Sequence, residues 1–143
     1  MSATIESKHG LVALPAEQLY MGFTDMRNLT QNVPQEYRDS VVADFDNLTA
    51  TVHGMTISVR IVERRPYSLI RIEDVQAPIH FSVSFHFDSV PGGTDFSIVA
   101  EADINAMMKA VVGHKIKKAL DQIVDGLVAV SHGQKPEYPS DRG

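Results

Sequence analysis

The clearest pattern in the chain is a long amphipathic segment near its C-terminal end. Between Asn105 and Ser131, apolar residues recur every three or four positions, and most lysine and acidic residues fall between them. This spacing places the apolar residues on one side of an α-helix. The residues concerned are Met108, Val112, Ile116, Leu120, Ile123, Leu127 and Val130. We predict one long helix over 105–131, with this side packed against the rest of the protein.

The middle of the chain, from Val41 onward, shows the alternation that is typical of β-strands. In the stretch from Ile79 to Phe87, every second residue is apolar and the residues between are polar. The next strand alternates in the same way up to Ile104. Short turns such as Pro91-Gly92-Gly93 separate the strands, so neighbouring strands are expected to be antiparallel. Earlier strands have shorter inward sets: Leu48, Ala50 and Val52; Ile57, Val59 and Ile61; Ile70 and Ile72.

The N-terminal part predicts one strand followed by two short helices. Alternation from Thr4 to Ala13 predicts a long first strand with Ile5, Ser7, His9, Leu11 and Ala13 on one face. Pro15 opens a short helix, because proline is tolerated in the first helical turn. A second helical segment begins near Met26 and ends before Pro34, which disfavours the helical conformation of its predecessor.

The predicted order is therefore one strand, two short helices, six strands and one long helix. It defines an α+β fold in which a curved antiparallel sheet of about seven strands wraps around the C-terminal helix. We expect a single domain over 1–133. The residues 134–143 are rich in proline, glycine and charge, and are expected to form a flexible tail.

Composition narrows the class of protein. A chain of 143 residues with 43% hydrophobic residues suits one domain. The formal net charge is −5, with no basic block beyond Lys115, Lys117 and Lys118, so nucleic acid is not an expected partner. Cysteine is absent, and the first ten residues lack the apolar core of a signal peptide. No apolar run is long enough to span a membrane, so we expect a cytoplasmic protein.

Two segments carry a resemblance to a known family. Residues 14–25, Leu-Pro-Ala-Glu-Gln-Leu-Tyr-Met-Gly-Phe-Thr-Asp, resemble the first-helix pattern of the START-like, SRPBCC superfamily, and Asn28, Leu29 and Pro34 continue it. Residues 102–108 resemble the passage from the last strand into the long helix in many bacterial members. The resemblance covers about Ile5 to Val130 and implies the helix-grip fold of plant pathogenesis-related and pollen-allergen proteins, lipid-transfer domains and polyketide cyclases.

What this resemblance implies for function is a cavity between sheet and helix. Many relatives hold lipids, sterols or aromatic products there, and a minority catalyse cyclisation or hydrolysis. The chain departs from the family in having no tryptophan and no glycine-rich loop of the plant-allergen type, which removes support for a plant-hormone or polyketide assignment. We expect the cavity to be lined by Ser7, His9, Leu11, Phe23, Met26, Ile70, Ile72, Phe81, Val83, Phe85, Ile98, Met108, Val112, Ile116 and Leu120.

Few residues predict chemistry in that cavity. His9 is the candidate catalytic residue, because on the inward face beside Ser7 its neutral imidazole would act as a base or bind a ligand hydroxyl. The alternative register turns it outward. On a later strand, Ile70 and Ile72 are favoured as the inward pair over Arg71 and Glu73. No metal-ligand spacing or nucleophile motif is present, so neither a metal nor a cofactor is expected.

Three functions remain open from the sequence. The first is binding of a hydrophobic or amphipathic small molecule between the sheet and the long helix. The second is a cyclase or hydrolase in which His9, helped by Ser7 or Arg71, moves protons on an aromatic or polyketide-like substrate. The third is an accessory protein whose cavity is collapsed and whose surface binds a partner. A homo-oligomer is compatible with all three.

Overall fold

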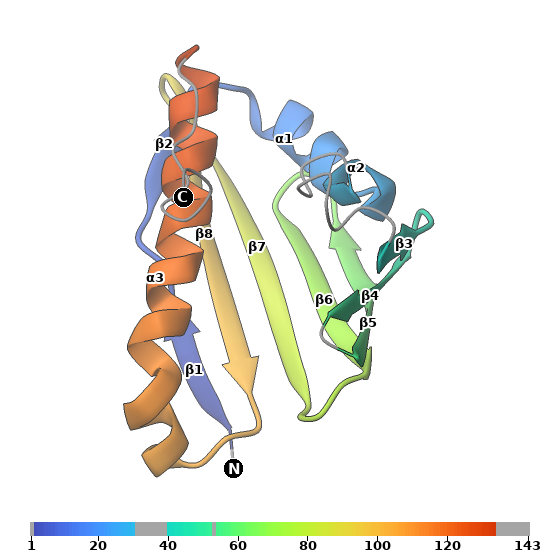
Figure 1. Ribbon diagram of the computed structural model, residues 1–143. Coiled ribbons are helices and arrows are strands. Elements are labelled where there is room, and N and C mark those ends of the chain that lie inside the picture. Colours follow the sequence, from blue (N-terminus) through green and yellow to red (C-terminus); the bar gives the residue numbers. More distant parts are fainter. Residues whose placement is uncertain (1, 31–39, 53, 134–143) are drawn as a thin grey trace.

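The computed structural model describes residues 2–30, 40–52 and 54–133 of the chain (Figure 1). It contains eight strands and three helices in these ranges. In chain order they are β1 Ala3–Glu6, β2 Gly10–Val12, α1 Ala16–Phe23, α2 Met26–Thr30, β3 Val41–Ala43, β4 Asn47–Val52, β5 Met55–Arg65, β6 Leu69–Gln76, β7 Phe81–Val90, β8 Gly93–Ala102 and α3 Ala106–Ser131.

The strands form one antiparallel sheet in the order β1-β8-β7-β6-β5-β4-β3, and β2 also pairs with β8. Helix α3 packs on β1, β2 and β8, so it covers one arm of the curved sheet (Figure 1). We call β1, β2, β8 and β7 the near arm, and β6 to β3 the far arm. Helices α1 and α2 cross the end of the sheet beside the C-terminal end of α3 (Figure 1). The predicted helix-grip α+β architecture is confirmed.

The first predicted strand is wrong in one respect: it is two strands, and this raises the strand number to eight. Glu6 pairs with Val99 and Gly10 with Phe96, so four steps along the chain match three steps along β8. Such an extra residue is a bulge, which reverses the faces of all residues that follow. The Ser7 hydroxyl occupies the gap, accepting a hydrogen bond from the Ile98 N–H at 2.8 Å.

The bulge corrects the predicted orientation of the residues after it. Gly10 and Val12 turn toward α3, whereas His9 and Leu11 turn to the outer face of the sheet. The bulge is also fixed to α3, because the main-chain N–H of Lys8 donates to Asp121 at 2.6 Å. The side chain of Lys8 forms an ion pair with Asp125 at 2.8 Å.

Helix α3 confirms the predicted long helix almost residue for residue. The Asn105 side chain caps it by accepting a hydrogen bond from the N–H of Met108, as its position before the periodic segment would favour. Leu120 and Val124 are buried. Met108, Ile123 and Val130, however, remain about half exposed, because the helix covers only the near arm and part of its apolar side faces the space beyond it.

The core lies between the sheet, α1 and the buried side of α3. Phe85 and Phe87 from β7 and Phe96 from β8 are buried and point to the same side. Phe23 from α1 packs on them, with ring centroids 5.0 Å from Phe85 and 5.5 Å from Phe96. The alternation predicted this inward face, although β7 begins at Phe81 and leaves Ile79 exposed outside the strand.

A second bulge decides how the far arm is joined to the helices. Ile61 pairs with Ile72 but Glu63 pairs with Arg71, so Val62 is an extra residue in β5. Arg64 therefore shares a face with the buried Ile70. Its guanidinium donates to the hydroxyl and carbonyl of Thr24 and to the carbonyl of Phe45, and it pairs with Asp46 at 2.7 Å. We call these contacts the Arg64 clasp.

Two expectations fall outside the described residues: the end of the second helix at Pro34 and the tail over 134–143. In the portion that the structure describes, no helix combines the length and the apolar character required to cross a lipid bilayer.

Candidate functional site

An apolar hollow lies between α3 and the α1–α2 segment. Its volume is about 560 Å³, and we call it the α3 pocket. Phe23 contributes from α1 and Leu29 from α2, while the remaining residues come from the C-terminal half of α3. The residues that line it are Phe23, Leu29, Ala119, Gln122, Ile123, Gly126, Leu127 and Val130.

Helix periodicity explains how α3 supplies one wall of this pocket. Ala119, Ile123, Gly126 and Val130 follow one another at intervals of three or four residues, and Leu127 is next to Gly126, so all five line one side of the helix. Ile123 and Val130 are 48% and 51% exposed, which is high for large apolar side chains on the sheet-facing half of a helix. Among the described lining residues, Gln122 carries the single side chain able to form hydrogen bonds.

Phe23 lies between the α3 pocket and the residues that the sequence predicted as the lining of the sheet–helix cavity. Its ring packs on Phe85 and Phe96 and fills the space above the sheet at that point. Several predicted lining residues are consequently buried core residues outside the pocket, namely Met26, Ile70, Ile72, Phe85, Ile98 and Leu120. Phe81, Val83, Val112 and Ile116 are half-buried, and Met108 is exposed.

Of the predicted lining set, the structure places Phe23 in the α3 pocket. The prediction missed Leu29, Ala119, Gln122 and Gly126. It had assigned Ile123, Leu127 and Val130 to the packed side of the long helix, so the periodic signal for three of the wall residues was present. The far-arm prediction is confirmed, since Ile70 and Ile72 are inward and Arg71 and Glu73 lie on the other face.

His9 lies away from this pocket. Its side chain is 65% exposed, and its Nδ1 is 3.0 Å from a carboxylate oxygen of Asp95 on the outer face of the sheet. Ser7 is buried, but its hydroxyl is engaged by the N–H of Ile98 and the carbonyl of Lys8. Ser7 is therefore on the inward face as expected, whereas His9 is turned outward, which is the alternative register, because of the extra residue at the β1–β2 bulge.

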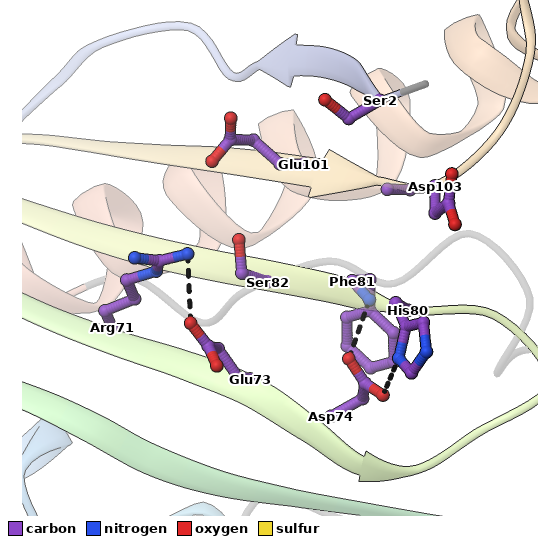
Figure 2. A pocket seen from close by; sticks show the side chains of 10 residues that line it. Ser2, Arg71, Glu73, Asp74, His80, Phe81, Ser82, Glu101 and Asp103 are labelled. Carbon is purple, nitrogen blue, oxygen red and sulfur yellow. Dashed lines mark hydrogen bonds and ion pairs between the residues drawn. The ribbon is translucent and has the colours of Figure 1, made fainter.

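A second hollow, of about 410 Å³, lies on the outer face at the other end of the sheet (Figure 2). Figure 2 shows Arg71, Glu73, Ser82 and Glu101 pointing away from α3, which lies behind the sheet. Arg71 pairs with Glu73 at 3.0 Å. Two carboxylates of this hollow have partners within it, since Glu73 pairs with Arg71 and Asp74 contacts His80 and Phe81.

The Asp74–His80 pair in this hollow closes the turn between β6 and β7 (Figure 2). One carboxylate oxygen of Asp74 accepts the N–H of Phe81 at 2.8 Å, and the other lies 2.9 Å from His80 Nδ1. The Phe81 N–H and His80 lower the pKa of Asp74, and the hydrogen bond to Asp74 raises the pKa of His80. Within the described ranges, no three His, Asp or Glu side chains converge as metal ligands.

Comparison with known proteins places this geometry in a known fold. No protein-family model and no curated protein matches the sequence. A solved structure of a norcoclaurine synthase point mutant from Thalictrum flavum has a TM-score of 0.70 at 12% identity, covering 93% of this chain and 96% of that chain. The structure of Ara h 8.0201 has a TM-score of 0.60 at 11% identity, covering 94% and 100%.

A bacterial structure extends the comparison. Protein CV1439 from Chromobacterium violaceum has a TM-score of 0.52 at 22% identity, covering 85% of this chain and 96% of that chain. The chain shares the helix-grip fold of these structures, which is the fold that the resemblance implied. At these identities the likeness concerns the fold, so function has to be argued from the side chains of this chain.

Proposed function

We propose that this protein binds a hydrophobic or amphipathic small molecule in the α3 pocket. The observation that carries the proposal is the partial exposure of Ile123 and Val130 on the wall of an apolar pocket of about 560 Å³. Apolar surface in contact with water is unfavourable by about 25 cal/mol per Å². A ligand that covers these side chains removes that penalty, and the volume lies within the usual range for small-molecule sites.

The lining also indicates the chemistry of the ligand. Phe23, Leu29, Ile123, Leu127 and Val130 would contact an apolar body. Gln122 offers an amide donor and acceptor, which suits a single hydroxyl or carbonyl group. The lining includes no charged side chain among its described residues, so a charged ligand group would remain at the solvent side. A second structure of norcoclaurine synthase from Thalictrum flavum contains dopamine and hydroxybenzaldehyde, which supports small aromatic molecules as members of the test panel.

The structure does not place the candidate catalytic residue of the enzyme alternative, His9, in the interior. That hypothesis required an inward His9, and His9 is paired with Asp95 on the outer face. A filled interior would favour the accessory-protein alternative, and Phe23 does fill the space above the sheet beside Phe85 and Phe96. We favour ligand binding because the α3 pocket beside Phe23 is open and apolar.

The test combines identification of a bound molecule with a variant that fills the pocket. Native mass spectrometry of the purified protein, followed by extraction, would identify a co-purified ligand. Displacement of the fluorescent probe anilinonaphthalene sulfonate by fatty acids, sterols and small aromatics would then rank the classes. Ala119→Trp should weaken binding about tenfold or more, because the indole occupies volume that the ligand needs.

A matched control uses another exposed alanine of the same helix. Ala110 faces a separate hollow beside Thr4 and Glu6, so Ala110→Trp should bind the probe as the wild type does. Equal loss in both variants would show that the probe does not report on the α3 pocket. The absence of any bound molecule, with no displacement by the panel, would reject the proposed function.

A further inference from the structure

The N-terminal half of α3 presents an exposed apolar surface that the ligand pocket does not explain. Met107 is 76% exposed, Val111 60% and Met108 46%. Met107 and Val111 are four residues apart and share the side of the helix that faces away from the sheet. A contiguous group of large, exposed apolar side chains is a typical mark of an interaction surface, whereas single exposed residues are ordinary.

Lysines are concentrated in the same half of the helix. Residues 106–120 contain Lys109, Lys115, Lys117 and Lys118 and no acidic residue, although the chain as a whole has a net charge of −5. Lys117 pairs with Asp121 at 3.2 Å on the side near β1. Lys115 and Lys118 follow Val111 by four and seven residues, so they stand beside the exposed valine.

The two ends of α3 lack the charged residues that would stabilise the helix. The first turns of a helix carry the positive end of its dipole, where acidic residues stabilise and basic residues destabilise. The first turn of α3 has no acidic residue, its last turn has no basic residue, and its lysines lie in the first half. The N-terminal half of α3 therefore combines lysines with exposed apolar side chains and lacks the acidic residues that would stabilise its first turn.

We propose that the surface formed by Met107, Met108, Val111, Lys115 and Lys118 docks on an anionic lipid membrane. Apolar side chains between lysines match the two layers of such a surface, in which the acyl chains lie beneath negatively charged headgroups. Lysine stems extend along the apolar layer while their ammonium groups reach the phosphates. A nucleic-acid backbone would attract the lysines but would gain nothing from Met107 and Val111.

The docking surface is continuous with the side of α3 that lines the ligand pocket. Met108, Val112, Ile116, Ala119 and Ile123 are three or four residues apart, so an apolar stripe runs from the docking surface to the pocket. The docking proposal does not depend on ligand binding, because its test uses the protein without added ligand. If both hold, the stripe gives a lipid-soluble molecule an apolar path between the membrane and the pocket.

The experiment is flotation of the protein with two kinds of vesicle: phosphatidylcholine alone, and an equal mixture of phosphatidylcholine and phosphatidylglycerol. The wild type should float with the anionic vesicles and much less with the neutral ones, and added salt should weaken the binding. Each lysine near the surface is expected to contribute about fivefold in affinity. The double change Lys115→Glu and Lys118→Glu should therefore abolish flotation, whereas Lys115→Arg with Lys118→Arg should preserve it.

The apolar part is tested by Met107→Asp with Val111→Asp, which should also abolish flotation. Val42→Asp is the matched control, because Val42 is equally exposed but lies on β3 in the far arm. Circular dichroism should show unchanged helix content in every variant. The proposal is overturned if the wild type ignores anionic vesicles, if the surface variants float like the wild type, or if the surface proves to join two copies of the chain in sedimentation without vesicles.

Discussion

The hydroxyl of Ser7 replaces a main-chain acceptor for the N–H of Ile98, at a donor–acceptor distance of 2.8 Å. The same hydroxyl donates to the carbonyl of Lys8 at 2.7 Å, while the N–H of Ser7 bonds to the carbonyl of Ile98. One side chain thus satisfies the polar groups that the extra residue between β1 and β2 would leave unpaired. The orientation of His9, Gly10 and Leu11 depends on this contact.

Replacing Ser7 by alanine should destabilise the fold by about 1–3 kcal/mol, because a buried N–H then loses its acceptor. Urea denaturation would measure the change. Ser89→Ala, at an exposed position near the end of β7, provides the control and should change stability by less than about 0.5 kcal/mol. Equal midpoints for the two variants would contradict the role given to the Ser7 hydroxyl.

Two glycine-to-alanine changes should have opposite signs. A β-carbon at Gly10 would lie 2.6 Å from Val124 Cγ1 and 2.7 Å from Val128 Cγ2, so Gly10→Ala should cost about 1–3 kcal/mol through overpacking against α3. Gly22 lies within α1 with no atom near the position of an added β-carbon. Gly22→Ala should stabilise the protein by about 0.5–1 kcal/mol. Thermal denaturation of both variants compares the two signs directly.

The Arg64 clasp predicts that lysine cannot replace this arginine. Lysine keeps the charge beside Asp46 but lacks the planar fork that reaches the carbonyls of Thr24 and Phe45 together. Arg64→Lys should therefore lower the free energy of unfolding by about 2 kcal/mol. Arg65→Lys, at an exposed neighbour that pairs with Glu63, should have almost no effect on the urea midpoint. If Arg64→Lys has the same free energy of unfolding as the wild type, the clasp adds no stability.

The Asp74–His80 pair predicts a defined pH dependence. The pKa of His80 is raised above 6.5, so its contribution to stability is complete below pH 6.5 and is lost as pH rises through the raised value. The pKa of Asp74 is lowered below 3.8, so its contribution is complete above pH 3.8 and is lost as pH falls through the lowered value. The pair is therefore most stabilising between these two values.

Thermal midpoints of the wild type and His80→Gln should differ most near about pH 5 and converge in alkaline solution. NMR titration adds a direct reading of the histidine. The pKa of His80 should fall in Asp74→Asn, because the carboxylate that raises it is gone. An unchanged pKa in that variant would place the cause elsewhere.

The fold was largely predictable because its signals are periodic and strong. The α3 pattern placed the helix within one residue, and the alternation in β7 and β8 identified the inward faces that carry Phe85 and Ile98. The same alternation across Ile70 and Ile72 gave the correct inward pair. These signals arise from burial along whole elements, so single irregularities do not erase them.

The candidate site was less predictable because it depends on single-residue insertions and on packing between distant elements. The alternation of residues 4–13 does not indicate the extra residue at the β1–β2 bulge. His9 and Leu11 therefore lie on the face opposite to the one predicted. The bulge at Val62, which turns Arg64 inward, gave no signal either. The pocket wall at Leu29 and Ala119 results from α2 meeting α3, a contact that periodicity within one element does not contain.

Helix α3 is anchored on the strands of the near arm, and this has a consequence for the width of the interior. The far arm is joined to the rest of the molecule by the β6–β7 ladder and by the Arg64 clasp onto the segment after α1. A change in the curvature of the sheet can therefore alter the width of the interior without breaking a contact of α3. The separation of the two arms then depends on the Arg64 clasp and on the contacts of α1 and α2 with β3, β4 and β6, while α3 stays fixed on the near arm.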